Sequence, residues 1–238
     1  MAELDFETRL FQARERGIGA LDEPAGKAIL ASFGINVPAS RVIDADEDVR
    51  ALVQGLSPPF VLKVIAPGVV HKSDVGGVRL GIRDVDELTT AIVALRQELR
   101  ARGIEPTAWL VEQMIPRGVE VVVGGLSDPE FGPMVMVGLG GIFVEVMKDV
   151  AFRICPIEPR DAFEMIEELQ GAPLLHGTRG GDPVSIDAIM ETLLRLGGEG
   201  GLLMRCDRHV AEVDINPLIV TRDRAVAADA RFILRSKA

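Results

Sequence analysis

The sequence has no tyrosine, one tryptophan and three histidines among 238 residues, so it offers little aromatic surface for stacking nucleobases. It also lacks an excess of basic charge, because 26 lysines and arginines stand against 36 aspartates and glutamates, giving a formal net charge of −10. Nucleic-acid binding depends on clustered Lys and Arg. Both shortages therefore argue against DNA or RNA as a partner.

Cysteine and long apolar runs are scarce as well. Cys155 and Cys206 lack the spacing of metal ligands and are expected to be small buried hydrophobic residues in a reducing compartment. No apolar run approaches the roughly 18 residues that cross a bilayer, and the first residues do not resemble a secretion signal. We therefore expect a globular, cytoplasmic protein without a membrane partner.

Hydrophobic periodicity predicts a mixed α+β protein without strict alternation of strand and helix. Helices are expected at residues 22–34, 84–103, 160–170 and 186–196. Strands are expected at 60–65 and 78–82, in an antiparallel meander at 109–115, 119–126, 134–139 and 142–147, and near 209–215, 218–220 and 225–228. These elements predict an N-terminal helical segment (1–20) and two lobes, 21–108 and 109–238, with a ligand cleft between them.

The most informative segment joins an apolar strand that carries Lys63 to the loop His71-Lys72-Ser73-Asp74-Val75-Gly76-Gly77. A lysine on a buried strand requires a partner, and the backbone N–H groups of paired glycines can approach phosphate oxygens closely. The segment therefore indicates phosphate chemistry. Since the loop connects two predicted strands and does not open a helix, it is not a Walker-type phosphate loop.

A second group of polar residues lies near the C-terminus. Along a strand, Glu212, Asp214 and Asn216 share one face, so three side chains with oxygen atoms point the same way. A neighbouring strand would bring Asp229 opposite Asn216, and Mg²⁺ takes one or two such protein oxygens together with nucleotide phosphates. An exposed polar strand face remains the alternative.

Taken in series, several separated segments resemble the ATP-grasp subunit of the ADP-forming (NDP-forming) acyl-CoA synthetases, which are relatives of the succinyl-CoA synthetase β subunit. The segments follow in order from about residue 20 and cover nearly the whole chain: 21–24, 33–38, 63–78, 111–115, 118–124, 131–141, 149–153, 179–180, 212–218 and 229–231. The resemblance implies an α+β ATP-grasp fold of two α/β lobes with the nucleotide cleft between them.

The resemblance also implies roles for individual residues. Lys63 matches the strand lysine on the nucleotide phosphates, Glu112, Gln113 and Met114 the segment along the adenine, and Glu120 an acid near the ribose or phosphates. Backbone donors from Ser73 to Gly77, with Gly76 among them, are expected to contact the phosphates and stabilise the transferring group. Arg153 is a further candidate for phosphate, with an ordinary ion pair as its alternative. Asn216 and Asp229 match the magnesium ligands, and Asp214 matches an acid near the phosphoryl acceptor.

His71 matches a relay histidine that passes a phosphoryl group between a histidine of the partner subunit and ADP. A neutral imidazole is nucleophilic near pH 7, and the neighbouring Lys72 would offset charge on the transferring group. The alternatives are that His71 is only a hydrogen-bonding loop residue and that Asp74 only stabilises its turn. His209 is expected to be structural, and His176 to order a turn.

Nothing in the sequence resembles the CoA-binding domain of these enzymes, so the resemblance implies a hetero-oligomer with a CoA-binding α subunit. The implied reaction is acyl-CoA + ADP + phosphate ⇌ carboxylate + CoA + ATP, with Mg²⁺, and GDP and the identity of the acyl group stay open. Two other functions remain: a non-catalytic nucleotide-binding module of a larger assembly, and an ATP-grasp carboxylate–amine ligase.

Overall fold

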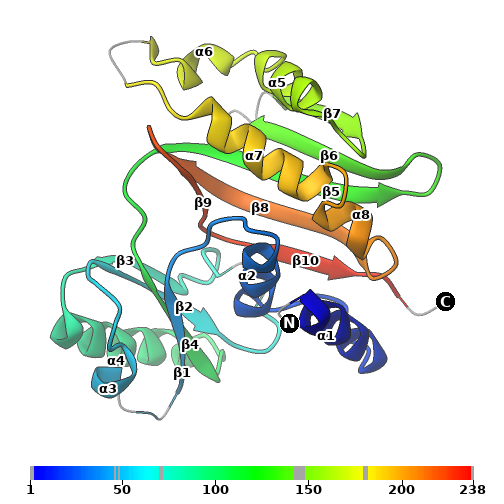
Figure 1. Cartoon of the computed structure of the whole chain (residues 1–238). Helices are drawn as coiled ribbons and strands as arrows, with labels where there is room; N and C mark the ends of the chain where they lie inside the picture. The colour runs from blue at the N-terminus through cyan, green and yellow to red at the C-terminus, as the bar shows by residue number, and fades with distance from the viewer. Residues whose placement is uncertain are drawn as a thin grey trace. The chain divides into compact units, whose positions relative to one another are not determined.

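The computed structural model describes residues 3–45, 47, 49–69, 72–141, 148–178 and 182–236. The chain forms two compact units, a small unit of Pro38–Ile115 and a large unit of Met1–Val37 with Pro116–Ala238 (Figure 1). Each unit combines helices with one antiparallel sheet, which confirms the predicted α+β class. The boundary between the lobes, predicted at residue 108, instead follows Ile115, and residues 21–37 belong with the C-terminal part of the chain.

The small unit is a four-stranded sheet in the order β1-β4-β2-β3, formed by β1 (Ser40–Asp44), β2 (Phe60–Ile65), β3 (Val78–Ile82) and β4 (Ala108–Gln113). The long helix α4 (Val85–Ala101) begins at Asp84, whose carboxylate accepts the Glu87 N–H at 2.8 Å. Its apolar stripe packs on the buried Phe60, Leu62 and Trp109 of the sheet. A short helix, α3 (Val49–Leu52), adds to this core.

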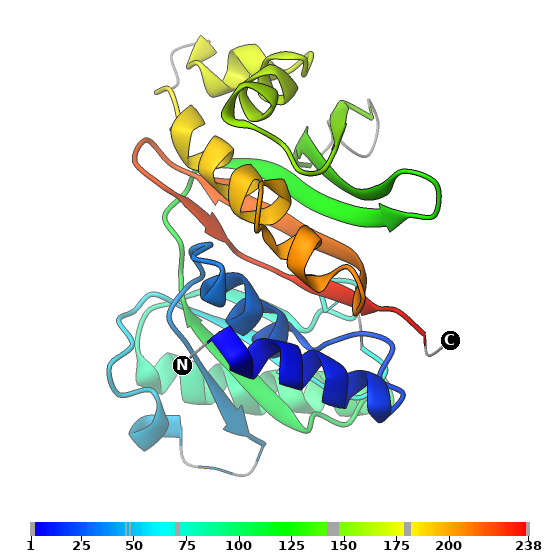
Figure 2. The same ribbon diagram turned by 45° about the vertical axis from the view of Figure 1, so that its right-hand side comes forward.

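The large unit is built on six strands, with β10-β8-β5-β6-β7 in order and β9 paired to β8. The strands are β5 (Val119–Asp128), β6 (Gly132–Leu139), β7 (Val150–Ile154), β8 (Val210–Val220), β9 (Ala225–Ala227) and β10 (Arg231–Leu234). Its helices are α1 (Glu3–Glu15), α2 (Glu23–Ser32), α5 (Pro159–Glu167), α6 (Ala172–Leu175), α7 (Ile186–Gly197) and α8 (Leu202–Cys206). Figure 2 shows helices α7 (gold) and α8 (orange) along one face of this sheet, which we call the helix-covered face; the other is the open face.

Helix α2 packs against the end of the chain, which explains why it belongs to the large unit. Asp22 caps it through the Ala25 N–H at 2.9 Å, as its sequence predicts. Gly26 lets it approach β10 closely, because an added Cβ would lie 3.0 Å from the Phe232 ring. Sequence order alone had placed this helix with β2 and β3.

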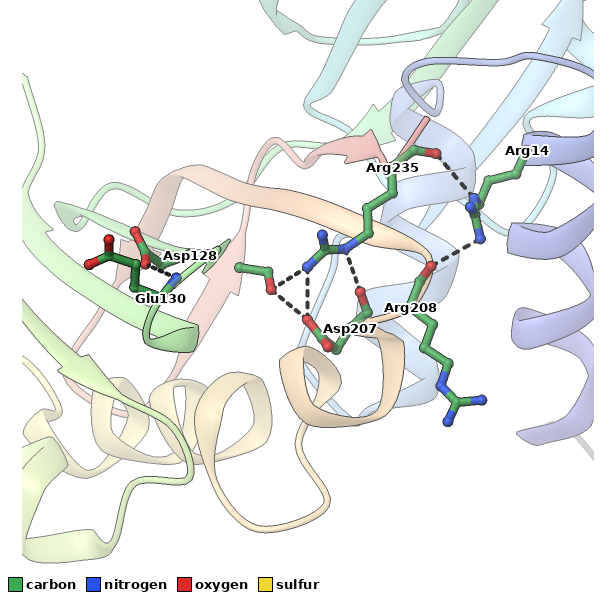
Figure 3. A network of polar contacts seen from close by, with 7 residues as sticks. Arg14, Asp128, Glu130, Asp207, Arg208 and Arg235 are labelled. Carbon is green, nitrogen blue, oxygen red and sulfur yellow. Dashed lines mark hydrogen bonds and ion pairs between the residues drawn. The ribbon is translucent and has the colours of Figure 1, made fainter. Parts of the chain in front are cut away.

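Helix α1 is the expected N-terminal helical segment, and a polar network fastens its end to the large unit (Figure 3). Arg14 donates to the carbonyl oxygens of Arg235 at 3.1 Å and Arg208 at 2.9 Å, and its guanidinium lies 3.3 Å from the ring nitrogen Nδ1 of His209. Arg235 in turn bonds to Asp207 through its side chain. His209 therefore has the structural role that its sequence context predicts.

Several strand predictions need correction. The meander does not start at Trp109, because β4 belongs to the other sheet; it consists of β5, β6 and β7. The predicted strands 209–215 and 218–220 are one strand, β8, which continues through a cis Asn216–Pro217 peptide. The predicted strand 142–147 lies outside the described residues, as do His71 and the Arg179–Gly180 turn. No helix in the described part of the chain is long and apolar enough to cross a membrane.

Candidate nucleotide and phosphoryl-transfer site

In the small unit, Lys63 and Glu112 form a buried ion pair on adjacent strands. The register places Val61 opposite Glu112 and Lys63 opposite Leu110, so the two charged side chains lie diagonally across β2 and β4 on the same face. Lys63 Nζ is 3.0 Å from Glu112 Oε2, and the two side chains are 10% and 3% exposed. The predicted partner of the strand lysine is thus a carboxylate of the same unit, which holds the ammonium in one place.

The loop after β2 is described from Lys72 onward, because His71 lies outside the described residues. Its glycines donate within the turn: Gly76 N–H bonds to the Ser73 carbonyl at 2.9 Å and Gly77 N–H to the Lys72 carbonyl at 2.7 Å. Gly76 has φ +66°, and a Cβ on Gly77 would lie 2.5 Å from Val64. Both glycines are required by the turn, which engages their N–H groups; phosphate contacts at Gly76 and Gly77 stay a prediction.

The backbone after Glu112 is also engaged within the small unit. Gln113 N–H donates to the Ala39 carbonyl at 2.9 Å, and Met114 N–H donates to the Pro59 carbonyl at 2.8 Å. These two N–H groups therefore hold the end of β4 in place. The predicted contacts of Gln113 and Met114 with a purine edge would therefore use groups of these residues other than their backbone N–H groups.

In the large unit, β8 carries its acidic residues on the open face. Val213 and Ile215 are buried in the core, whereas Glu212 and Asn216 are exposed and Asp214 is half-buried, which confirms the predicted alternation. Past Pro217 the buried positions become Leu218 and Val220. The core-facing positions therefore switch from odd-numbered residues directly before Asn216 to even-numbered residues after it.

The pairing of β8 with β9 and β10 brings Asp229 to Asn216. Leu218 pairs with Ala227 on one side and Asp214 pairs with Arg231 on the other, a register that places residue 229 opposite residue 216. A hydrogen bond of 2.9 Å from Ala228 N–H to the Pro217 carbonyl closes the interval between the two pairings. The juxtaposition predicted from the sequence is therefore present in the backbone.

The rest of the open face combines polar and apolar side chains. Glu120 on β5 is exposed and follows the same parity, because Val121 beside it faces the core. Gly124 on β5 pairs with Asp214 of β8 on one side and with Met136 of β6 on the other. No side chain fits at Gly124, because a Cβ there would lie 2.8 Å from the Val213 carbonyl oxygen. The open face is therefore bare backbone at Gly124, beside Asp214.

Comparison with known proteins decides the family. A family model described as an ATP-grasp domain matches residues 12–234. The chain belongs to the ATP-grasp family. It is 41% identical over 216 residues to the acetate–CoA ligase [ADP-forming] I subunit beta of Pyrococcus furiosus, covering 90% of this chain and 91% of the relative.

Two further relatives of this ATP-grasp chain are informative. The acetate–CoA ligase [ADP-forming] I of Archaeoglobus fulgidus is 37% identical over 232 residues, but the chain spans only 32% of that protein's length. The acetyl-coenzyme A synthetase 1 of Candidatus Korarchaeum cryptofilum, solved with coenzyme A and Mg-AMPPCP and with its phosphohistidine segment pointing towards the nucleotide binding site, superposes with a TM-score of 0.82 at 39% identity. That alignment covers 97% of this chain and all of the solved chain.

The donor set of the ATP-grasp chain fits magnesium. The described residues contain no cluster of three or more His, Cys, Asp and Glu able to enclose a metal ion. Asn216 and Asp229 instead offer one amide oxygen and one carboxylate across adjacent backbones, and Mg²⁺ is typically held by one or two protein oxygens with phosphates and water completing its octahedron. This pair suits a metal that arrives with a nucleotide.

Arg153 is the clearest correction among the predicted site residues. It pairs with the buried Val135, which places it on the helix-covered face, away from Asp214 and Asn216. Its guanidinium forms a two-pronged ion pair with Glu168, and this hydrogen bonding raises the pKa of Arg153 and lowers that of Glu168. The ion-pair alternative is therefore the one that describes this arginine.

A neighbour in the same segment was missed by the sequence reasoning. Asp149 is 4% exposed and accepts two backbone N–H groups, from Gln170 at 2.8 Å and Gly171 at 2.9 Å. Together with Arg153 it fastens β7 to the end of α5. In the sequence, Asp149 is visible only as an acidic residue directly before a strand. That position does not distinguish a carboxylate that accepts backbone N–H groups from one that binds a ligand.

The predicted burial of both cysteines is confirmed. Cys155 and Cys206 are buried, and burial raises the pKa of the Cys155 thiol to about 11. His176 caps the C-terminal end of α6 and lies 2.8 Å from the Glu167 carboxylate; the turn at 179–180 that it was predicted to order lies outside the described residues.

Proposed function

We propose that the chain is the ATP-grasp subunit of an ADP-forming acyl-CoA synthetase. It binds ADP or ATP with Mg²⁺ and passes a phosphoryl group between the nucleotide and a histidine of its partner. The net reaction is acyl-CoA + ADP + phosphate ⇌ carboxylate + CoA + ATP, catalysed reversibly. Relatives named as acetate–CoA ligases support acetate as the first acid to test.

The observation that carries this proposal is the Asn216–Asp229 juxtaposition beside Asp214 on the open face. An amide and a carboxylate held across adjacent backbones suit a magnesium ion bound to nucleotide phosphates, and the Korarchaeum relative was solved in complex with Mg-AMPPCP. Magnesium in such a site neutralises charge on the transferring phosphoryl group. Asp214 and Glu120 supply further polar groups on the same face.

Lys63 serves in this proposal as a point charge for the nucleotide phosphates. The Glu112 carboxylate holds the ammonium by its buried ion pair, which reduces the side-chain freedom that phosphate binding would otherwise have to remove. Lys72 and Ser73, in the turn closed by Gly76 and Gly77, follow His71 directly and carry donors for a phosphoryl group on its imidazole. His71 itself accepts the phosphoryl group at a ring nitrogen. An oxygen of ADP then attacks phosphorus, the P–N bond breaks, and the imidazole is the leaving group.

The chain acts as part of a multi-subunit enzyme. The Pyrococcus relative is named a β subunit, and the Archaeoglobus relative joins a segment like this one to about twice as much additional chain. The proposed partner is a CoA-binding α subunit that carries the acyl-transfer chemistry and the second phosphohistidine. Such an assembly would be a hetero-oligomer.

The experiment is to mix the chain with a CoA-binding α subunit, acetyl-CoA, phosphate, ADP and Mg²⁺ and to measure ATP with luciferase. ATP should form, and His71→Ala should abolish its formation without changing the Kd for ADP. His176→Ala is the matched control, because this second histidine is hydrogen-bonded to Glu167 and has no role in the proposed relay, and the activity of the variant should equal that of the wild type. Absence of ATP with every acyl-CoA offered, or full activity of His71→Ala, contradicts the proposal.

A further inference from the structure

A buried ion pair lies on the first two turns of α2, in the large unit. Glu23 and Lys27 are four residues apart, Lys27 Nζ is 2.8 Å from Glu23 Oε1, and the lysine and glutamate side chains are 4% and 1% exposed. Burying two charges is costly, and a hydrophobic pair of similar volume is often as stable. A buried pair of this kind therefore requires a reason other than stability alone.

The lysine uses its charge on the segment that carries Asp229. Lys27 Nζ donates to the Ala228 carbonyl oxygen at 2.7 Å, one peptide before Asp229. The N–H of the same residue, Ala228, bonds to the carbonyl of Pro217, the residue that follows Asn216. Asp229 Oδ1 accepts the N–H of Ala230 at 2.7 Å, so the backbone around this carboxylate is fixed on both sides.

Helix α2 and its flanks follow the same segment over its whole length. Leu21 N–H bonds to the Phe232 carbonyl at 3.0 Å, and Asn36 Nδ2 bonds to the Ala225 carbonyl at 3.1 Å. Residues 228–230 lie between β9 and β10 and belong to neither strand, although the Ala228 N–H still bonds to the Pro217 carbonyl of β8. Lys27 supplies a side-chain bond within this interval.

We propose that Lys27, oriented by Glu23, is the positioning residue of the metal carboxylate Asp229. By holding the Ala228 carbonyl it keeps Asp229 opposite Asn216 at the separation a small octahedral cation demands. The inference rests on the proposed function, since it assumes that Asn216 and Asp229 bind the nucleotide's magnesium. Partners that orient metal ligands typically change metal affinity by about 10–100-fold when they are removed.

The test uses the whole chain and Mn²⁺, whose electron paramagnetic resonance signal reports the bound fraction, with AMPPCP present. The variant is Glu23→Gln with Lys27→Met, which removes both charges together and leaves no unpaired one in the interior. The matched control is Asn36→Ala, which deletes another bond from the α2 flank to a backbone carbonyl of the same segment, at Ala225.

The paired variant should weaken Mn²⁺ binding by about tenfold or more, while Asn36→Ala changes it less than twofold at similar loss of thermal stability. Metal-free AMPPCP should bind both equally. Unchanged Mn²⁺ affinity in the paired variant, or equal weakening in Asn36→Ala, overturns the positioning role alone. Failure of the wild-type chain to bind Mn²⁺ with AMPPCP overturns the proposed function, and the inference with it.

If the paired variant does not fold, Lys27→Arg takes its place. The planar guanidinium cannot keep both the 2.8 Å contact to Glu23 and the 2.7 Å contact to Ala228 with the geometry of an ammonium. Mn²⁺ affinity should then fall at least about threefold, with the thermal stability of the variant measured alongside. Wild-type affinity in Lys27→Arg counts against the proposal.

Discussion

The buried Lys63–Glu112 pair allows stability and ligand binding to be separated in one set of variants. At 3.0 Å and an effective dielectric constant of 20, the two charges attract each other by about 5.5 kcal/mol, part of which is cancelled by their desolvation. Lys63→Met leaves a glutamate side chain that is 3% exposed without its ion-pair partner, and Glu112→Gln does the same to the lysine. Each single substitution should destabilise the small unit by about 3–5 kcal/mol.

The double variant, Lys63→Met with Glu112→Gln, should lose no more than about 2 kcal/mol, because no buried charge is left uncompensated. Urea denaturation followed by tryptophan fluorescence measures this in the right unit, since Trp109 is the only tryptophan and is fully buried in the core of the small unit. The coupling energy between the two positions should be at least about 2 kcal/mol.

Nucleotide affinity should behave differently from stability in the same variants. The double variant folds but lacks the ammonium, so its Kd for ADP should rise at least about tenfold, equivalent to about 1.4 kcal/mol. A double variant that binds ADP like the wild type would exclude Lys63 as a phosphate contact. Additive losses of stability, with no coupling, would show that the 3.0 Å pair does not hold in solution.

Three further predictions concern single side chains. Gly77→Ala should destabilise the small unit by about 1–3 kcal/mol in the same fluorescence assay, because its Cβ would lie 2.5 Å from Val64, and an unchanged midpoint would contradict this turn geometry. Arg153→Met should change the Kd for ADP less than twofold, since the arginine pairs with Glu168 on the helix-covered face; a tenfold loss would restore it to the nucleotide site. Burial raises the pKa of the Cys155 thiol to about 11 from about 9, so its contribution to stability is fully present below pH 9 and is lost as the pH rises to 11. Over that interval the free energy of unfolding of the wild type should fall by up to about 2 kcal/mol more than that of Cys155→Ala. Parallel curves of stability against pH would refute this.

The sequence predicted those parts of the fold whose signals are local. Asp22 and Asp84 act as the helix caps that their positions predict, and strands β2 and β3 have the predicted bounds. The edge strands β1 and β10 were not predicted, because they are short and only partly buried, which leaves little periodicity. Nor could the order of elements reveal that α2 packs on β10; Gly26 was the only local signal of that close approach.

The candidate site shows the same limit. Alternation along β8 was enough to place Glu212, Asp214 and Asn216 on one face, because a strand fixes side-chain direction by parity. Arg153 lies on an edge strand, where parity has meaning only once the pairing to Val135 is known. Glycines in a loop are equally compatible with an anion site and with a tight turn, and only the hydrogen bonds of Gly76 and Gly77 show the turn.

The central claim, that this ATP-grasp chain carries a phosphoryl group through His71, is tested most directly by trapping that group. The chain is incubated with γ-labelled ATP, Mg²⁺ and the CoA-binding partner, quenched in alkali and digested, and the peptide containing residue 71 is analysed by mass spectrometry. We predict an acid-labile, alkali-stable phosphohistidine at His71 that disappears on addition of ADP and is absent from His71→Ala but present in His176→Ala. ATP formation by the assembly without label at His71 at any time would contradict the relay and favour direct transfer to the nucleotide.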